Sequence, residues 1–533
     1  MNIEADYVIV GAGSAGCVLA DRLSEDGAQV VLVEAGPADR HPMIHIPAGI
    51  LSLLHHPRLN WNYFSEPETE SGNRPIHWPR GKVLGGSSSI NGMLYVRGNP
   101  ADYDGWAQRG CTGWSWDDVL PYFMKSERYD GGDEAIRGRD GPLAVEDYRT
   151  ILPLTHRFVE AARQAGFDLN PDLNGTSQEG VGYSQMTRLG RFRGSTARTY
   201  LARAKGRANL RIETDALATG LILDGKRCTG IAYRQADVAH TATTRREVIV
   251  AGGAVNSPHL LQISGIGPAA HLKSIGLEVV HDLPGVGTNL SDHYAVRVVH
   301  RAHGQTTMNE LSRGWRKARE IGRFFLAGRG ALTFGVTSAQ VFCRSREGLA
   351  SPDIQLLFTP ASYESGKVLA LEDRPGWTTA ICPTRPASRG TIMAASADPA
   401  AAPVIRPRYL SDADDLRVLA AGIGHARRIN AAPALARYSV AETRPGASID
   451  DDAGFKTFAA EQGNTLYHPV GTCGMGTHDL AVVDAKLRVH GLAGLRVVDA
   501  SVMPTLPTGN TNAPSIMIAE KAAAMIQAAG RTG

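Results

Sequence analysis

Apolar and polar positions near the N-terminus predict a strand, a glycine-rich turn, a helix and a second strand. Tyr7 to Val10 form an apolar run, GAGSAG follows from Gly11 to Gly16, and CVLADRLSE predicts the helix. A second apolar run, Val30 to Val33, ends at Glu34. In such a unit the first glycine permits the tight turn, the second lets a pyrophosphate approach the backbone, and the third lets the helix pack on the sheet. A carboxylate at the end of the second strand can hydrogen-bond a ribose diol, so this stretch predicts dinucleotide binding.

The middle of the chain first adds further strands to the nucleotide-binding unit and then forms a block with a different pattern. Residues 209–230 alternate as in a hairpin, and residues 246–253 form an apolar strand that ends in a glycine turn. After His300 come a charged helix, several strand-like pieces and an amphipathic helix over residues 412–430. This second block is expected to be inserted between parts of the nucleotide-binding unit.

These patterns predict an α/β protein in which a Rossmann-like domain carries an inserted domain built on an antiparallel sheet. We expect the Rossmann-like domain to comprise residues 1–155, 191–299 and 463–533. The inserted substrate domain is expected to comprise residues 156–190 and 300–462.

The C-terminal stretch contains the candidate chemistry. Leu495 to Ile526 reads as an apolar run, an Asp, a proline-broken loop and a long helix, with Asn512 as the expected capping residue. The free N–H groups of a helix start favour an anion or an electron-rich ring. Upstream, His468 lies in YHPVGT, a loop without helical or strand periodicity. Either residue alone is more often an ordinary loop polar group, and our hypothesis is that His468 and Asn512 meet at one site.

Composition narrows the class of protein. The 533 residues are 43% hydrophobic and 20% charged, with a net charge of +3. The basic residues are dispersed, which argues against nucleic-acid binding. Six cysteines show no CxxC pair or zinc spacing, so no metal site is expected and a reducing compartment is favoured. We find no signal peptide and no apolar run long enough to span a membrane, which predicts a cytoplasmic protein and leaves peripheral membrane association open.

Several motifs together resemble the glucose-methanol-choline (GMC) flavoprotein oxidoreductases. The first family signature is similar to residues 81–104, GKVLGGSSSINGMLYVRGNPADYD, and the second to residues 253–267, GAVNSPHLLQISGIG. GAGSAG, EAG, YHPVGT, DASVMP and NTNAPS complete the set. Within that family the sequence most resembles choline-dehydrogenase-like alcohol dehydrogenases and aryl-alcohol and hydroxymethylfurfural oxidases. The block from about residue 300 to 462 matches only in general character.

The resemblance implies FAD and a set of residues that bind it. Members with covalent FAD carry a histidine where this chain has Ile90, so we expect dissociable FAD. The family's catalytic histidine, with its second histidine or asparagine, matches His468 and Asn512. The residues that the resemblance places on the cofactor are Gly11, Gly13, Ser14, Ala15, Gly16, Glu34, Ala35, Val83, Gly86, Asn91, Gly92, Met93, Leu94, Ala218, Asp499, Ala500 and Thr511.

The implied activity is oxidation of a primary alcohol to its aldehyde, in which His468 removes the hydroxyl proton and hydride passes to flavin N5. Electrons would then pass to oxygen or to a quinone-type acceptor, and the sequence does not choose between them. An alternative within the fold is a non-redox relative, a hydroxynitrile lyase or a fatty acid photodecarboxylase, for which Cys382 or Cys473 would be the residues to examine. A hydrolase is disfavoured because the chain has no GxSxG elbow.

Overall fold

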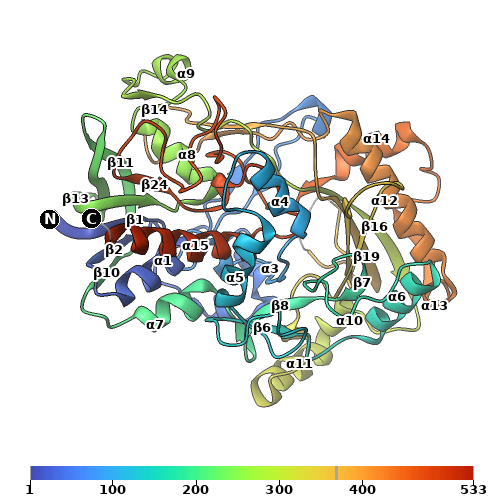
Figure 1. Cartoon of the computed structure of the whole chain (residues 1–533). Coiled ribbons are helices and arrows are strands. Elements are labelled where there is room, and N and C mark those ends of the chain that lie inside the picture. The colour runs from blue at the N-terminus through green and yellow to red at the C-terminus, as the bar shows by residue number, and fades with distance from the viewer. Residues whose placement is uncertain (1, 366–369, 532–533) are drawn as a thin grey trace.

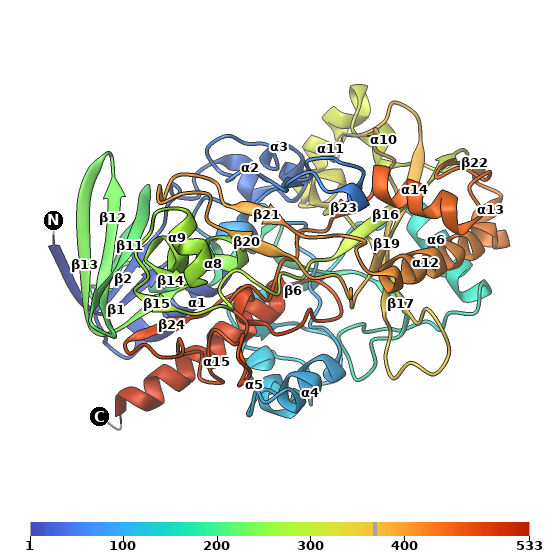
Figure 2. The same ribbon diagram turned by 90° about the horizontal axis from the view of Figure 1, so that it is seen from above.

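The computed structural model describes residues 2–365 and 370–531 and shows two lobes, each built on a sheet (Figures 1 and 2). The first sheet has seven strands in the order β10-β2-β1-β13-β12-β11, and β24 pairs with β13. β10, β2, β1, β13 and β24 run parallel, whereas β11 and β12 form the antiparallel hairpin expected from the alternation. These strands span β1 Asn2–Val10, β2 Val30–Val33, β10 Leu210–Glu213, β11 Ala216–Asp224, β12 Arg227–Gln235, β13 Val238–Val250 and β24 Leu495–Val497.

Two long helices pack together beside this sheet although they come from opposite ends of the chain. α1 (Ser14–Glu25) follows the glycine turn, and α15 (Asn512–Arg531) ends the described chain. Glu520 of α15 is fully buried and pairs with Arg22 of α1 at 2.8 Å. Buried charges persist only where they are paired, so this ion pair fixes how the C-terminal helix lies against the nucleotide-binding unit.

The second sheet is wholly antiparallel, in the order β22-β16-β19-β18-β17-β7 with β23 paired to β16. This confirms the expected antiparallel insert. The strands are β7 Gly180–Tyr183, β16 Tyr294–Ala302, β17 Ala339–Cys343, β18 Ile354–Thr359, β19 Gly376–Pro383, β22 Ser439–Arg444 and β23 Asn464–Thr465. Helices α6 Pro153–Gln164, α12 Ala413–Ala431, α13 Pro433–Ala436 and α14 Asp452–Gln462 lie on one side of it (Figure 2).

Alternation along the central strands divides the second sheet into two faces. Val296 and Val298 of β16 join the core that includes α6 and α12, as do Leu356 and Phe358 of β18. The residues between them point to the opposite face, toward the first lobe. That second face is the one that matters for the site described below.

Shorter elements connect the lobes and cover the edges. Among the helices are α2 Pro42–His45, α3 Ile50–Leu53, α4 Pro100–Gln108, α5 Trp116–Ser126, α7 Ala202–Ala204, α8 Gly253–Ile263, α9 Ala269–Ser274, α10 Met308–Leu311 and α11 Gly314–Ala327. The short strands are β3 Tyr63–Phe64, β4 His77–Trp78, β5 Glu127–Arg128, β6 Leu143–Asp147, β8 Gln185–Leu189, β9 Phe192–Arg193, β14 Ile266–Gly267, β15 His281–Asp282, β20 Thr391–Met393 and β21 Val404–Arg406.

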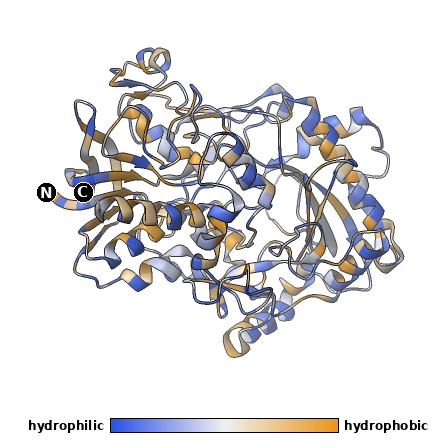
Figure 3. Ribbon diagram, in the orientation of Figure 1, coloured by the Kyte–Doolittle hydropathy of each residue, from blue (hydrophilic) through white to orange (hydrophobic). Residues whose placement is uncertain are grey.

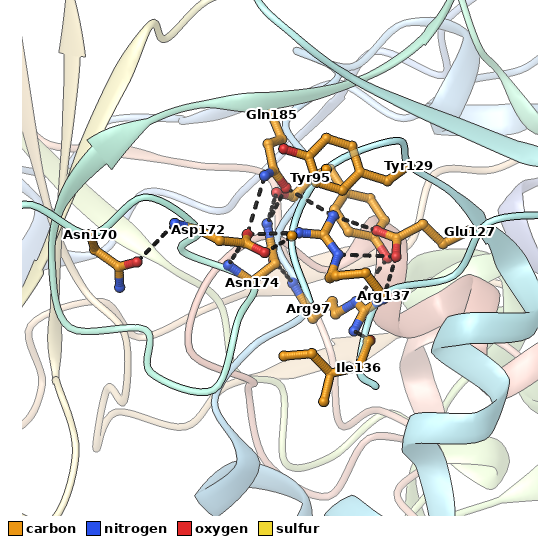
Figure 4. Close-up of polar contacts among 12 residues, drawn as sticks. Tyr95, Arg97, Glu127, Tyr129, Ile136, Arg137, Asn170, Asp172, Asn174 and Gln185 are labelled. Atoms are coloured by element: carbon orange, nitrogen blue, oxygen red, sulfur yellow. Dashed lines mark hydrogen bonds and ion pairs between the residues drawn. The ribbon is translucent and has the colours of Figure 1, made fainter. Parts of the chain in front are cut away.

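A buried ionic network ties three of these connecting segments together (Figure 4). Both oxygens of Glu127 accept hydrogen bonds from Arg137, at 2.6 and 3.1 Å, and one of them also pairs with Arg97. Arg137 reaches Asp172 at 2.6 Å through its other nitrogen and is fully buried. The network fixes the position of Arg97. Leu94, three residues before Arg97 in the chain, lines the cavity described next. Residues 127–137 therefore have a supporting role.

None of the helices in residues 2–365 and 370–531 combines the length and apolar character needed to cross a membrane. The six cysteines are all buried and unpaired with one another.

Candidate active site

One cavity runs from the glycine turn of the first lobe to the second sheet. The cavity has a volume of about 340 Å³. Most residues expected on a dinucleotide line it: Gly11, Gly13, Ser14, Ala15, Glu34, Ala35, Gly86, Asn91, Gly92, Met93, Leu94, Ala218, Asp499, Ala500 and Thr511. Gly16 and Val83 are not among its lining residues. Val83 is buried instead with Ile44 and Ile90 in a small apolar cluster.

The glycine turn has the geometry that the spacing requires. A Cβ on Gly16 would lie 1.8 Å from the carbonyl oxygen of Gly11, so only glycine lets α1 pack this closely on the turn. Gly13 has open space where its Cβ would point. At the end of β2, the carboxylate of Glu34 accepts the N–H groups of Ala12 at 2.8 Å and Gly36 at 2.9 Å, and burial raises its pKa to about 7. Glu34 therefore braces the turn while it lines the cavity.

At the other end of the cavity, the hydrogen-bonding partner of His468 is Asn510, two residues before the expected Asn512. The Asn510 Nδ2 atom lies 3.0 Å from His468 Nε2. Asn512 is held elsewhere, because its Oδ1 accepts a hydrogen bond from Ser14 Oγ at 2.7 Å. His468 and Asn512 both line the cavity, as expected of residues that meet at one site, but the carboxamide hydrogen-bonded to His468 is that of Asn510.

Asn512 has a different structural role from the capping residue that we expected. α15 begins at Asn512, and the carbonyl of Thr511 accepts both the N–H and the Oγ–H of Ser515. Through the bond to Ser14, the first residues of α15 and α1 are joined, so two helix starts face the cavity together. Their free N–H groups favour negative charge at that point.

A second histidine, His293, fixes the orientation of His468. His293 Nε2 lies 3.0 Å from the carbonyl oxygen of Thr384, and His293 Nδ1 lies 2.9 Å from His468 Nδ1. A carbonyl only accepts, so in neutral His293 the proton is on Nε2 and Nδ1 is an acceptor. His468 must then donate from Nδ1, so its unprotonated Nε2 faces the cavity and accepts from Asn510 Nδ2.

Asp292 holds the backbone of the same loop. Its Oδ1 accepts the N–H of His468 at 2.7 Å, and its Oδ2 accepts from Thr465 Oγ1 at 2.6 Å and from the hydroxyl of Tyr409. Asp292 and His293 are neighbours at the end of a loop that the sequence showed only as glycine-rich. An acid directly followed by a histidine could have indicated a functional site in this loop, but we predicted a role for neither residue.

Burial keeps both imidazoles neutral. Burial lowers the pKa of His293 to about 4. The pKa of His468 is lowered well below its ordinary value, first by burial and then by the neighbouring His293 and Arg80. A neutral histidine with an oriented lone pair can accept a proton, so this end of the cavity has a general base and an amide donor at one point.

Comparisons with known proteins agree on one family. Models described as GMC oxidoreductase match residues 5–295 and 386–519. The chain is 42% identical to an alcohol dehydrogenase (acceptor) of Pseudomonas putida, over 98% of this chain and 95% of that protein. It is 43% identical to an oxygen-dependent choline dehydrogenase of Brucella anthropi, with the same coverage. An FAD-dependent oxidoreductase from Chaetomium thermophilum is similar with a TM-score of 0.91 and 26% identity, over 99% of this chain and 100% of that one.

The chain belongs to the GMC oxidoreductase family. The cofactor implied for this GMC oxidoreductase is FAD. The residues present fit it, because the glycine turn and Glu34 lie at one end of the cavity and buried polar atoms without protein partners lie along it. These atoms are His259 Nε2, Tyr467 Oη and Asn510 Oδ1, which have no hydrogen-bond partner among the described residues.

The features that would favour a non-redox relative are not found at the site of this GMC oxidoreductase. Cys382 is fully buried, and its thiol donates to the carbonyl of Pro383. Cys473 is buried in the core of the first lobe. Neither cysteine belongs to the described residues that line the cavity. Ile90 does line it, at the position where covalent members carry histidine.

Proposed function

We propose that this enzyme oxidises a primary alcohol to the aldehyde, with His468 as the general base. The observation that carries the proposal is the hydrogen-bond chain from Thr384 through His293 to His468, which leaves the Nε2 lone pair of His468 in the cavity beside Asn510. Both names among the close relatives, an alcohol dehydrogenase and a choline dehydrogenase, support this class of substrate.

The residues act on the hydroxyl group of the alcohol. His468 Nε2 accepts the hydroxyl proton, while Asn510 Nδ2 donates a hydrogen bond to the alcohol oxygen and holds it in place. The alcohol loses one proton and one hydride and becomes the aldehyde. FAD, when bound, supplies the acceptor for that hydride. After proton transfer His468 still donates from Nδ1 to His293, so the imidazolium keeps its orientation.

Residues of the first lobe hold the cofactor in this proposal. The glycine turn with Glu34 receives the adenosine half, and the stretch from Asn91 to Leu94 with Ala218 lies along the rest of the cavity. The joined starts of α1 and α15 favour negative charge beside the ring. Because Ile90 cannot form a covalent link, we expect FAD to be released intact by denaturation. The electrons pass on to oxygen or to a quinone-type acceptor.

The test is flavin reduction by alcohol without oxygen, followed by stopped-flow absorbance. The variant His468→Ala should retain yellow bound flavin and lose about 10²- to 10⁴-fold in the reduction rate, the usual contribution of a positioned acid or base. Full-rate reduction in that variant would remove His468 from the mechanism. Bleaching of the wild-type flavin by alcohol in the dark separates this activity from a lyase or a photodecarboxylase. Hydrogen peroxide formation compared with reduction of a quinone-like dye identifies the acceptor.

A further inference from the structure

Among the described residues of the second sheet, Arg297 is the arginine that lines the cavity. Arg297 lies at the centre of β16 and lines the cavity, whereas its neighbours Val296 and Val298 belong to the core on the opposite face. β16 pairs with β19 so that Arg297 is opposite Ala380, and Ala380 is opposite Leu357 of β18. Small and apolar side chains therefore flank the guanidinium across the sheet.

Arg297 forms no hydrogen bond or ion pair with any residue that the structure describes. Two acidic groups of neighbouring segments, Asp292 and Glu372, are already engaged. Asp292 accepts from His468 and Thr465, and Glu372 pairs with Arg301 and Arg444. A guanidinium with five donors in a recessed, largely apolar site is unfavourable unless an anion meets it.

The charge of Arg297 reaches the histidine end of the cavity. Burial raises the pKa of Tyr363 to about 12, and the positive charge of Arg297 opposes that rise. It acts in the same direction on Tyr467, the residue before His468. Among the described residues lining the cavity the acidic ones are Glu34 and Asp499, and both lie in the first lobe on the expected cofactor positions. On the second-sheet side the field is therefore positive.

We propose that Arg297 is a specificity-determining residue that binds a carboxylate on the alcohol substrate, so that the preferred substrates are ω-hydroxy acids. This proposal rests on the proposed function and names its substrate class. The planar guanidinium binds a carboxylate through two parallel hydrogen bonds. It disfavours a cationic alcohol such as choline, because the quaternary ammonium would meet a like charge in a partly desolvated site.

The experiment measures anaerobic flavin reduction with matched pairs of alcohols. ω-Hydroxyalkanoates of increasing chain length are compared with their methyl esters, which differ only in charge. Choline is compared with its tert-butyl analogue, in which carbon replaces the quaternary nitrogen. The hydroxy acid of best length should exceed its ester by about 10- to 100-fold in kcat/KM, the worth of a charge-assisted bidentate contact. Choline should fall below its uncharged analogue.

Variants at the same position provide the control. Arg297→Met should remove the preference for the acid and leave the ester within about threefold of wild type, since Arg297 does not touch the reacting hydroxyl. Arg297→Lys should keep part of the preference for the acid. Arg297→Glu should make choline a better substrate than its uncharged analogue, the reverse of the order in wild type. Bound flavin absorbance reports that each variant is folded.

The outcomes separate the two proposals. If acid and ester are oxidised equally by wild type and Arg297→Met, the inference about Arg297 is overturned while alcohol oxidation stands. If no alcohol bleaches the flavin, the proposed function itself fails.

An independent observation concerns the outer surface of α11. This helix projects from the body at the bottom of Figure 1, and Figure 3 shows hydrophobic colour on it. Trp315, Ile321, Phe325 and Leu326 are 68%, 37%, 56% and 88% exposed. They recur at helical spacing on the side away from the buried Phe324, so this amphipathic helix turns its apolar face to solvent.

Basic side chains surround that face. Arg316, Lys317, Arg319 and Arg323 lie on the same helix, and the guanidinium of Arg319 lies 5.1 Å from the ring centre of Trp315. The one acid of the helix, Glu320, is buried, pairs with Arg319 and Arg323 and accepts the N–H of Ala331. Glu320 thus fastens α11 to the body. Arg316 also pairs with Glu310 at 2.9 Å, and because the four basic residues outnumber these two acids the surface still carries net positive charge.

We infer that α11 docks on an anionic lipid surface. Exposed Trp, Phe and Leu beside arginines match a helix that lies in the membrane interface, with the charges at the headgroups. A second copy of this chain would bring like charges together, which is why the bilayer is the occupant that the charges favour.

Sedimentation of the flavin-loaded enzyme with phosphatidylglycerol vesicles tests this inference. We expect binding to these vesicles, a blue-shifted tryptophan emission, and much weaker binding to phosphatidylcholine. The triple variant Trp315→Ser, Phe325→Ser, Leu326→Ser should weaken partitioning more than about 100-fold with alcohol oxidation unchanged. Leu480→Ser, at another exposed leucine, is the matched control. Absence of vesicle binding, or a dimer in solution that the triple variant abolishes, would overturn it.

Discussion

His293 offers the sharpest test of how the site works, because it touches the base but not the alcohol. In His293→Leu the His468 Nδ1–H loses its acceptor 2.9 Å away, and the carbonyl of Thr384 loses its donor. His468 is then free to carry its proton on either ring nitrogen. Only the form with an unprotonated Nε2 can take the hydroxyl proton beside Asn510.

The size of the effect follows from the buried hydrogen bond. A buried donor left without a partner costs about 1–3 kcal/mol. A free-energy difference of 1.4 kcal/mol corresponds to a factor of ten, so the rate of flavin reduction should be about 10- to 100-fold below wild type. This is the range typical of groups that hydrogen-bond a reactive residue and fix its orientation. The loss should be smaller than in His468→Ala, because the base is still present.

The assay is anaerobic stopped-flow reduction at saturating alcohol over a range of pH. His293→Asn is the matched control, because the amide oxygen of asparagine can accept from His468 Nδ1–H where leucine cannot. We expect Asn to recover most of the rate.

A structural role alone would not produce this pattern. If His293→Leu reduced its flavin at the wild-type rate, the orientation chain would be refuted. Equal losses in His293→Leu and His293→Asn would also contradict it, since the two variants differ in the acceptor they present to His468.

Three further predictions follow from the same coordinates. Asn510→Ala should slow flavin reduction by about 10- to 100-fold, whereas Asn512→Ala should leave the rate within about threefold and weaken FAD retention, as equilibrium dialysis can measure. The wild-type reduction rate should stay level as pH falls from 8 to the ordinary histidine value of 6.5 and decline only below it, because protonation removes the base and the pKa of His468 is lowered. Glu127→Gln should destabilise the enzyme by about 3–5 kcal/mol in urea unfolding, since Arg97 is left buried without a carboxylate and Arg137 keeps only Asp172. An unchanged midpoint would show that the network in Figure 4 contributes little.

The nucleotide-binding end could be predicted from the sequence because its geometry is decided locally. Within some thirty residues the strand, the turn and the helix must fit together. A Cβ on Gly16 would lie 1.8 Å from the carbonyl oxygen of Gly11, which leaves no alternative to glycine. The same holds for the hairpin, whose strands pair across a short turn. Such features depend on neighbours in the chain, which a reader of the sequence can see.

The histidine end could be predicted only in part, because its contacts join distant segments. His293 and His468 are 175 residues apart, and nothing in either loop indicates that their rings meet. Asn510 and Asn512 both lie in one loop, and helix capping favoured Asn512. Gly509 adopts a φ of 128°, a conformation that suits glycine, and this turn in the loop places the Asn510 amide at His468.

Arg297 lies between these two cases. The sequence around it, YAVRVVHRA, is a mostly apolar run typical of a strand, and successive residues of a strand point to opposite faces, so Arg297 could be assigned to the face opposite Val296 and Val298. Which face is covered by helices and which by the cofactor-binding lobe depends on how the inserted sheet docks, and that is set by contacts from residues more than a hundred positions away. Once the sheet is docked, a residue that a pattern would assign to solvent becomes a cation that lines the cavity. If Arg297 binds the substrate as we propose, the choice of substrate depends on the insertion itself, while the chemistry depends on the loops that it covers.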